Sequence, residues 1–220
     1  MLGKQMEATL IPHHRVKVVF NWEECKEDID SYCDMNCNIP ILMGGSHVSA
    51  TPEFTLSKTS VDYVLRGECE RPIVKWLNYM LGRLPVEAVP NLGYKQNGTL
   101  CFNPLEDNYR IEDLPWPDLS DFRIDHYCYN KKPMTFMITS RSCPHKCSFC
   151  SVHTTFGHRY QRRPVDDVLA EIQLRYRQGY RTIDFEDDNL TFYKSEFKYL
   201  CRGIIVNFPN REMQFVAMNG

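Results

Sequence analysis

The stretch MTFMITSRSCPHKCSFC, residues 134–150, is the part of the chain that decides its expected fold. The first half, MTFMITS, is apolar and rich in strand-forming residues, so it predicts a strand over 134–140. The second half places Cys143, Cys147 and Cys150 in a C-x3-C-x2-C run directly after that strand. Because α/β proteins place their sites at the carboxyl ends of strands, we expect this loop to be functional.

The sequence after the cysteine loop alternates between helical and strand patterns. Pro164 followed by Asp166 and Asp167 is typical of a helix N-terminus, where acidic side chains are favoured. Together with the strand before the cysteines, these patterns predict a βαβαβ order. The expected elements are a helix over 165–178, a strand over 180–187, a helix over 194–206 and a strand over 213–218.

The sequence before the cysteine loop also indicates α/β structure, with apolar strands and helices that have one apolar face. This rhythm predicts an open parallel sheet. The expected elements are a strand over 16–20, a helix over 22–36, strands over 39–45 and 61–65, and a helix over 71–81.

Between these two parts, residues 84–133 carry six of the thirteen prolines, which remove backbone donors and disfavour a sheet interior. Asn97-Gly98 within this segment is a hairpin signal. We therefore expect three parts: an α/β domain over 1–83, a Pro-rich connector with a hairpin over 84–133, and a second α/β part over 134–220.

The composition excludes several classes of protein. The net charge of −2 argues against a nucleic-acid binder that relies on bulk charge, and no nucleic-acid partner is expected. There is no apolar run long enough for a membrane span and no signal peptide, so a cytoplasmic protein is expected. Ten cysteines in such a chain indicate thiols or metal ligands more than disulfides.

The cysteine run itself predicts a metal centre. Soft thiolates favour iron–sulfur clusters or zinc, and three of them can bind three irons of a [4Fe–4S] cube while the fourth iron stays open. A zinc site that adds His145, His153 or His158 as a fourth ligand is the alternative. The other cysteines are expected to pack as small apolar side chains. These are Cys25, Cys33, Cys37, Cys69, Cys101, Cys128 and Cys201.

The three cysteines, with Phe149 just before the last one, resemble the loop that characterises the radical S-adenosylmethionine (SAM) superfamily. ILMGGSHVSATPE (41–53), VDYVLRGECERPI (61–73), DLPWPD (113–118) and IDFEDDNLT (183–191) follow the order found in the branch with a cobalamin-binding domain. The resemblance implies an α/β fold: part of a Rossmann-like cobalamin-binding-type domain, then the first βα units of a partial (β/α) barrel.

The resemblance also implies a chemistry. A [4Fe–4S] cluster would bind SAM and cleave it reductively to a 5′-deoxyadenosyl radical, for methyl transfer or for radical cyclisation or rearrangement of a small-molecule substrate. The electron would come from a donor such as flavodoxin or ferredoxin. The alternative from another class is a non-catalytic iron–sulfur or zinc-binding interaction module that uses the same cysteines.

The site residues that the resemblance implies are few. Cys143, Cys147 and Cys150 would be the cluster ligands, and the backbone at Phe149 would contact adenine. Asp187 or Asp188 would bind the SAM ammonium group, with helix capping as the other interpretation. Gly44 and Gly45 would line the nucleotide tail of cobalamin, with an ordinary tight turn as the alternative. No catalytic side chain is assigned.

The sequence departs from the family pattern in two respects. It has no D-x-H-x-x-G motif for the lower cobalt ligand, which puts cobalamin binding in doubt. The stretch from Met134 onward is far shorter than the roughly 250 residues of a full barrel, so we expect a chain truncated at both ends. Arg159, Arg162 and Arg163 form a basic run that predicts a solvated helix start, or else contacts to an anionic substrate group.

Overall fold

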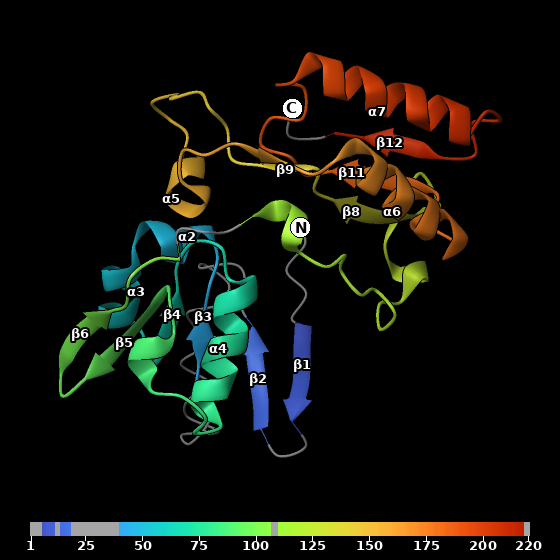
Figure 1. The fold of residues 1–220 in the computed structure, drawn as a ribbon. Helices are drawn as coiled ribbons and strands as arrows, with labels where there is room; N and C mark the ends of the chain where they lie inside the picture. Colours follow the sequence, from blue (N-terminus) through green and yellow to red (C-terminus); the bar gives the residue numbers. More distant parts are fainter. Residues whose placement is uncertain (1–5, 12–13, 19–39, 107–109, 218–220) are drawn as a thin grey trace. The chain divides into compact units, whose positions relative to one another are not determined.

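The structure is a computed structural model in which the chain groups into two compact units, and each is described by itself (Figure 1). The helix expected over 22–36, which contains Cys25 and Cys33, lies outside the described residues, and so does Cys37. The described residues are 6–11, 14–18, 40–106 and 110–217. Unit 1 comprises Met1–Asn108 and Phe149–Gly157, and unit 2 comprises Tyr109–Ser148 and His158–Gly220.

Unit 1 is built on a four-stranded sheet in the order β3-β4-β5-β6. β3 and β4 are parallel, as expected, but β5 and β6 run antiparallel to their neighbours. The expected all-parallel sheet is therefore wrong for this unit, because the Asn97-Gly98 hairpin pairs with β4 instead of remaining in a separate connector. The strands are β3 (Leu42–Met43), β4 (Tyr63–Leu65), β5 (Leu92–Gln96) and β6 (Thr99–Phe102).

Both faces of this sheet are buried, because successive residues of a strand point to opposite faces. Met43 and Val64 pack in one apolar cluster with Val48 and Leu56, whereas Leu42 packs in a second cluster with residues such as Trp76. The helices of unit 1 are α2 (Ser46–Ala50), α3 (Pro52–Lys58), α4 (Glu70–Met80), α5 (Val152–Phe156) and the short 3-10 helix η1 (Val86–Ala88).

β3 is shorter than the strand expected over 39–45, and local hydrogen bonds explain why. The backbone N–H of Ile41 donates to the Asp62 carboxylate at 2.8 Å, so it is not available for a strand ladder. A further antiparallel pair in unit 1 joins β1 (Met6–Ile11) to β2 (His14–Val18), at the position of the first expected strand.

Unit 2 confirms the βαβαβ order expected after residue 134. Its sheet has the order β12-β11-β8-β7, in which β8, β11 and β12 are parallel and β7 is antiparallel to β8. The strands are β7 (Cys128–Tyr129), β8 (Lys132–Met137), β11 (Thr182–Phe185) and β12 (Gln214–Val216), with a separate short pair β9 (Ser140–Arg141) and β10 (Gln161–Arg162).

Helices α6 (Val165–Arg177) and α7 (Lys194–Asn207) contribute to one apolar core against this sheet. Met137, Ile183 and Phe185 contribute from the strands. Two 3-10 turns, η2 (Ile111–Asp113) and η3 (Ile124–His126), precede the sheet. α6 and α7 lie within one residue of their expected bounds, because both carry a clear apolar face.

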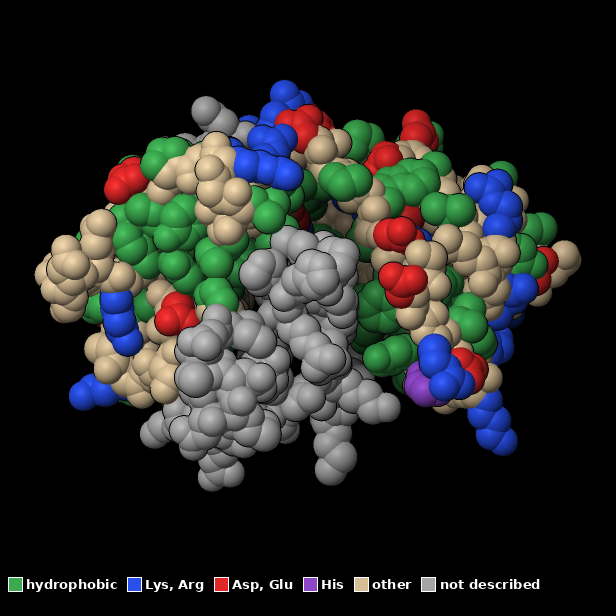
Figure 2. All heavy atoms as spheres, turned by 90° about the horizontal axis from the view of Figure 1, so that it is seen from below, with side chains coloured by type: hydrophobic (Ala, Val, Ile, Leu, Met, Phe, Trp, Pro, Cys, Tyr) green, Lys and Arg blue, Asp and Glu red, His purple; other side chains and the backbone are tan. Residues whose placement is uncertain are grey.

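The surface mixes charged and apolar side chains, and Figure 2 shows one face of it. Several large apolar side chains are exposed, including Val74 on α4 and Ile205 and Val206 on α7. Cys128 is exposed, so its expected packing role is wrong, whereas Cys69 and Cys101 pack against a core cluster of unit 1. Among the described residues, no helix is both long and apolar enough to span a bilayer.

Candidate metal centre

The cysteine loop starts at the end of β9 and returns to the sheet region through β10. β9 and β10 pair antiparallel, with Arg141 opposite Gln161 and Ser140 opposite Arg162. Cys143 is partly buried and belongs to unit 2, as does the exposed Cys147. Cys150 is exposed and lies in the segment 149–157 that groups with unit 1. All three are free thiols.

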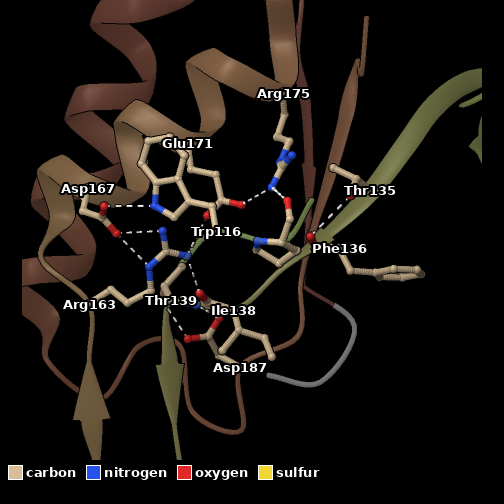
Figure 3. A network of polar contacts seen from close by, with 11 residues as sticks. Trp116, Thr135, Phe136, Ile138, Thr139, Arg163, Asp167, Glu171, Arg175 and Asp187 are labelled. Atoms are coloured by element: carbon tan, nitrogen blue, oxygen red, sulfur yellow. Dashed lines mark hydrogen bonds and ion pairs between the residues drawn. The ribbon is translucent and has the colours of Figure 1, made fainter. Parts of the chain in front are cut away.

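Asp187 anchors the backbone just before the loop. Its carboxylate follows β11, is 1% exposed, and accepts hydrogen bonds from the Thr139 backbone N–H at 3.1 Å and from the Thr139 hydroxyl at 2.7 Å (Figure 3). The Ser140 hydroxyl donates to it as well. These bonds explain why β8 ends at Met137 and not at 140, since the N–H of Thr139 is directed to a carboxylate. Sequence reasoning missed the Thr139–Ser140 partnership with Asp187.

The neighbouring Asp188 holds the next residue of the loop. Its carboxylate accepts a hydrogen bond from the Ser142 backbone N–H at 3.0 Å. Ser142 is buried and adopts a φ of 67°, in the left-handed region that costs a non-glycine residue of order 1–3 kcal/mol. Asp188 therefore secures the turn that leads into Cys143. Whether either carboxylate binds SAM stays a prediction.

Asn189 reaches the first cysteine directly. Its side-chain amide donates to the Cys143 sulfur at 3.4 Å. The three consecutive residues 187–189 thus contact four residues of the segment 139–143, namely 139, 140, 142 and 143. The sequence carried a signal for this contact, because Asn189 follows Asp187-Asp188 at the end of a strand expected to be parallel to the one before the cysteines. The carboxyl ends of parallel strands meet at one edge of a sheet.

A buried ion-pair network lies under the start of the loop (Figure 3). Arg163 is 9% exposed, donates to the Ile138 carbonyl at 3.0 Å, and pairs with Asp167 and Glu171, each at 2.7 Å. Glu171 also pairs with buried Arg175 at 2.7 Å. The expected solvated basic run is therefore wrong for Arg163. Two cations and two anions balance here, as buried charges require.

The other two arginines of the basic run line a small polar pocket in unit 2. The pocket has a volume of about 170 Å³ and is formed by residues around η2 and β10. Arg162 also donates to the Leu190 carbonyl at 3.0 Å, which ties β10 to the segment after Asn189. The lining residues are Arg110, Ile111, Glu112, Arg159, Tyr160, Gln161 and Arg162.

The remaining predicted site residues are in unit 1. Phe149 is 90% exposed. Gly45 has a φ of 107° and begins α2, and a methyl group added there would meet no atom within 4 Å. At Gly44 the nearest atoms would be the Leu65 carbonyl oxygen at 3.7 Å and the Cys69 sulfur at 3.9 Å. A tight turn accounts for Gly45, and contact of either glycine with cobalamin stays a prediction.

Within the described residues, no group of three or more His, Cys, Asp or Glu side chains converges as ligands of a single metal ion. The zinc alternative stays a prediction, as does the cluster. A [4Fe–4S] cube is larger than one ion, and each thiolate binds a different iron, so its ligands need not converge on one point.

Comparison with known proteins adds the family context. No protein-family model matches the chain. An uncharacterised methyltransferase of Pyrococcus horikoshii is 32% identical over 164 residues, which cover 73% of this chain and 36% of the relative.

Two solved structures share the fold. One is the radical S-adenosylmethionine methyltransferase TsrM from Kitasatospora setae with cobalamin and a [4Fe-4S] cluster bound. It matches with a TM-score of 0.66 and 16% identity, over 88% of this chain and 39% of that one. The other, the cobalamin-dependent S-adenosylmethionine radical enzyme OxsB, also has a TM-score of 0.66 and 16% identity, over 86% of this chain and 28% of that one. The chain therefore spans well under half the length of each of these three proteins.

Proposed function

We propose that this chain is a radical SAM protein similar to TsrM and OxsB, in which Cys143, Cys147 and Cys150 bind a [4Fe–4S] cluster for methyl transfer. The observation that carries the proposal is the loop itself: three free thiols on eight consecutive residues, with the backbone before the first one fixed by buried hydrogen bonds. An iron–sulfur cluster requires thiolate ligands, and the donor set fits it.

The residues around the loop fit the same group. Cys147 and Cys150 are exposed and can be reached by incoming iron and sulfide, whereas Cys143 is partly buried beside an amide donor. One-electron reductive cleavage of SAM to a 5′-deoxyadenosyl radical is the chemistry that the cluster supplies when bound. The three cysteines would leave one iron open for the amino and carboxylate groups of SAM.

The chain's own residues then have distinct roles. Asp187 orients the Thr139–Ser140 backbone, and Asp188 fixes Ser142 in its left-handed conformation. These contacts order the loop before any cofactor binds, so less conformational entropy is lost on binding. The backbone at Phe149 would contact adenine, and its exposed ring leaves that side of the loop accessible.

Methyl transfer is the proposed outcome because a relative at 32% identity and the matched structure TsrM are both named as methyltransferases. A small molecule is the proposed substrate class and a low-potential one-electron carrier the proposed donor. Because Gly44 and Gly45 have no side chains, cobalamin could approach the backbone closely at these two residues. The 220 residues lack the D-x-H-x-x-G motif, so they supply no lower cobalt ligand of that kind.

Anaerobic reconstitution with iron and sulfide tests the proposal. The reduced protein should show a [4Fe–4S] electron paramagnetic resonance (EPR) signal that changes when SAM is added. Single Cys→Ala variants at 143, 147 and 150 should lose the signal, whereas Cys128→Ala, at an exposed thiol on β7, should keep it. A protein that takes up zinc and no iron would instead support a non-catalytic metal-binding module.

A further inference from the structure

The three cysteines differ in their surroundings, and the difference lies in one contact. The Asn189 amide lies 3.4 Å from the Cys143 sulfur, within hydrogen-bond range for a sulfur acceptor. Among the described residues, Cys147 and Cys150 have no such donor, and both are exposed. One of the three thiolates would therefore bind its iron while already accepting a hydrogen bond.

Asn189 is held in position independently of the cysteine. Its backbone carbonyl accepts hydrogen bonds from the Tyr160 hydroxyl at 3.3 Å and from the Phe192 N–H at 3.4 Å. The Tyr160 and Phe192 rings also contact each other edge to face, with centroids 5.0 Å apart. The backbone of Asn189 is thus held by the Tyr160–Phe192 pair through contacts that do not involve Cys143.

The acceptor side is equally fixed. Asp188, the residue before Asn189, binds the N–H of Ser142, the residue before Cys143. The adjacent residues Asp188 and Asn189 therefore hold the adjacent residues Ser142 and Cys143. This parallel arrangement restricts how far the Asn189 amide and the Cys143 sulfur can separate.

An N–H donor to a ligating sulfur has a defined electronic effect. It stabilises negative charge on the sulfur, and the reduced cluster carries one electron more than the oxidised one. Hydrogen bonds to sulfur are accordingly among the features that set iron–sulfur reduction potentials. We infer that Asn189 is a positioning residue that raises the reduction potential of the cluster through Cys143. This inference rests on the proposed cluster and adds a residue that controls its electron acceptance.

The test compares reduction potentials by EPR-monitored titration of the reconstituted protein. Asn189→Leu keeps a similar volume but removes the donor, so the midpoint should move to a more negative value with iron and sulfide content unchanged. A tenfold change in the ratio of reduced to oxidised cluster corresponds to a 59 mV shift for one electron. Asn189→Gln retains an amide and should recover part of the shift.

Asn210→Ala is the matched control, because Asn210 is an exposed asparagine of unit 2 that hydrogen-bonds to Glu212. Its midpoint should equal that of the unaltered protein. If Asn189→Leu binds a full cluster at the original potential, the inference is wrong and the proposed cluster stands. Loss of iron in Asn189→Leu would also overturn it, in favour of a role in cluster assembly. Failure of the unaltered protein to bind iron would overturn both.

Discussion

Among the described residues, the four-stranded sheet of unit 1 and the four-stranded sheet of unit 2 differ in how their faces are covered. In unit 1, apolar clusters bury both faces, with Met43 in one cluster and Leu42 in the other. In unit 2, the apolar core lies on the face of Met137, Ile183 and Phe185. The alternate residue Phe136 on β8 is 43% exposed.

The second face of the unit 2 sheet also carries an acidic side chain. Asp184 is paired in register with Phe136, so the two residues share this face. Its carboxylate is buried, and neither oxygen has a hydrogen-bond partner within the described residues. Apolar side chains buried on both faces of a sheet stabilise the fold, whereas a sheet face that keeps a polar side chain is available to contact a ligand. The cysteine loop follows β8 of this sheet and then the short strand β9, which pairs with β10.

The largest loss of stability among these predictions is expected at Trp76, which lies on α4 in unit 1 and is 1% exposed. Trp76→Ala should lower the free energy of unfolding by about 3–5 kcal/mol, through lost burial and the cavity left behind. Urea denaturation followed by far-UV circular dichroism measures it. Val74→Ala, on the same helix but 55% exposed, is the control. Equal losses in the two variants would contradict the two-faced burial of this sheet.

Adjacent residues of β8 sharpen the comparison within unit 2. Met137→Ala should cost about 2–5 kcal/mol, because Met137 is 3% exposed in the core. Phe136→Ala should cost only about 1 kcal/mol, since full burial of such a side chain is worth about 1.5–3 kcal/mol and Phe136 is partly exposed. The same denaturation experiment compares them. A larger loss for Phe136 would mean that the second face is a core as well.

A smaller effect on stability is expected at Asp187, where the polar edge of the unit 2 sheet meets the cysteine loop. Asp187→Asn replaces an acceptor oxygen by an N–H donor that would face the donors of Thr139, so about 1–3 kcal/mol should be lost. Iron uptake on reconstitution should fall as well, because the backbone before Cys143 loosens.

Iron content and thermal denaturation measure the two effects at Asp187. Asp121→Asn, at an exposed position in the same unit, is the control and should change neither. Full iron uptake by Asp187→Asn, with unchanged stability, would show that the loop is ordered by other contacts.

The sequence alone predicted the parts of the fold that local patterns specify. Helices α6 and α7 and the strand order of unit 2 follow from apolar periodicity, which each segment carries within itself. The C-x3-C-x2-C run indicated soft-metal chemistry, because thiolates at close spacing are a chemical property of the chain. That the three cysteines bind a cluster stays a prediction.

Contacts between distant segments were decided by the tertiary structure. The Asn97-Gly98 turn specified a hairpin, but a turn does not determine which strand the hairpin joins, and here it joins β4. A run of charged residues does not reveal which ones are buried, and Arg163 is buried because Glu171 lies within reach on α6. Asn189 and Cys143 are 46 residues apart. Their contact exists because β8 and β11 are parallel neighbours whose carboxyl ends meet at one edge.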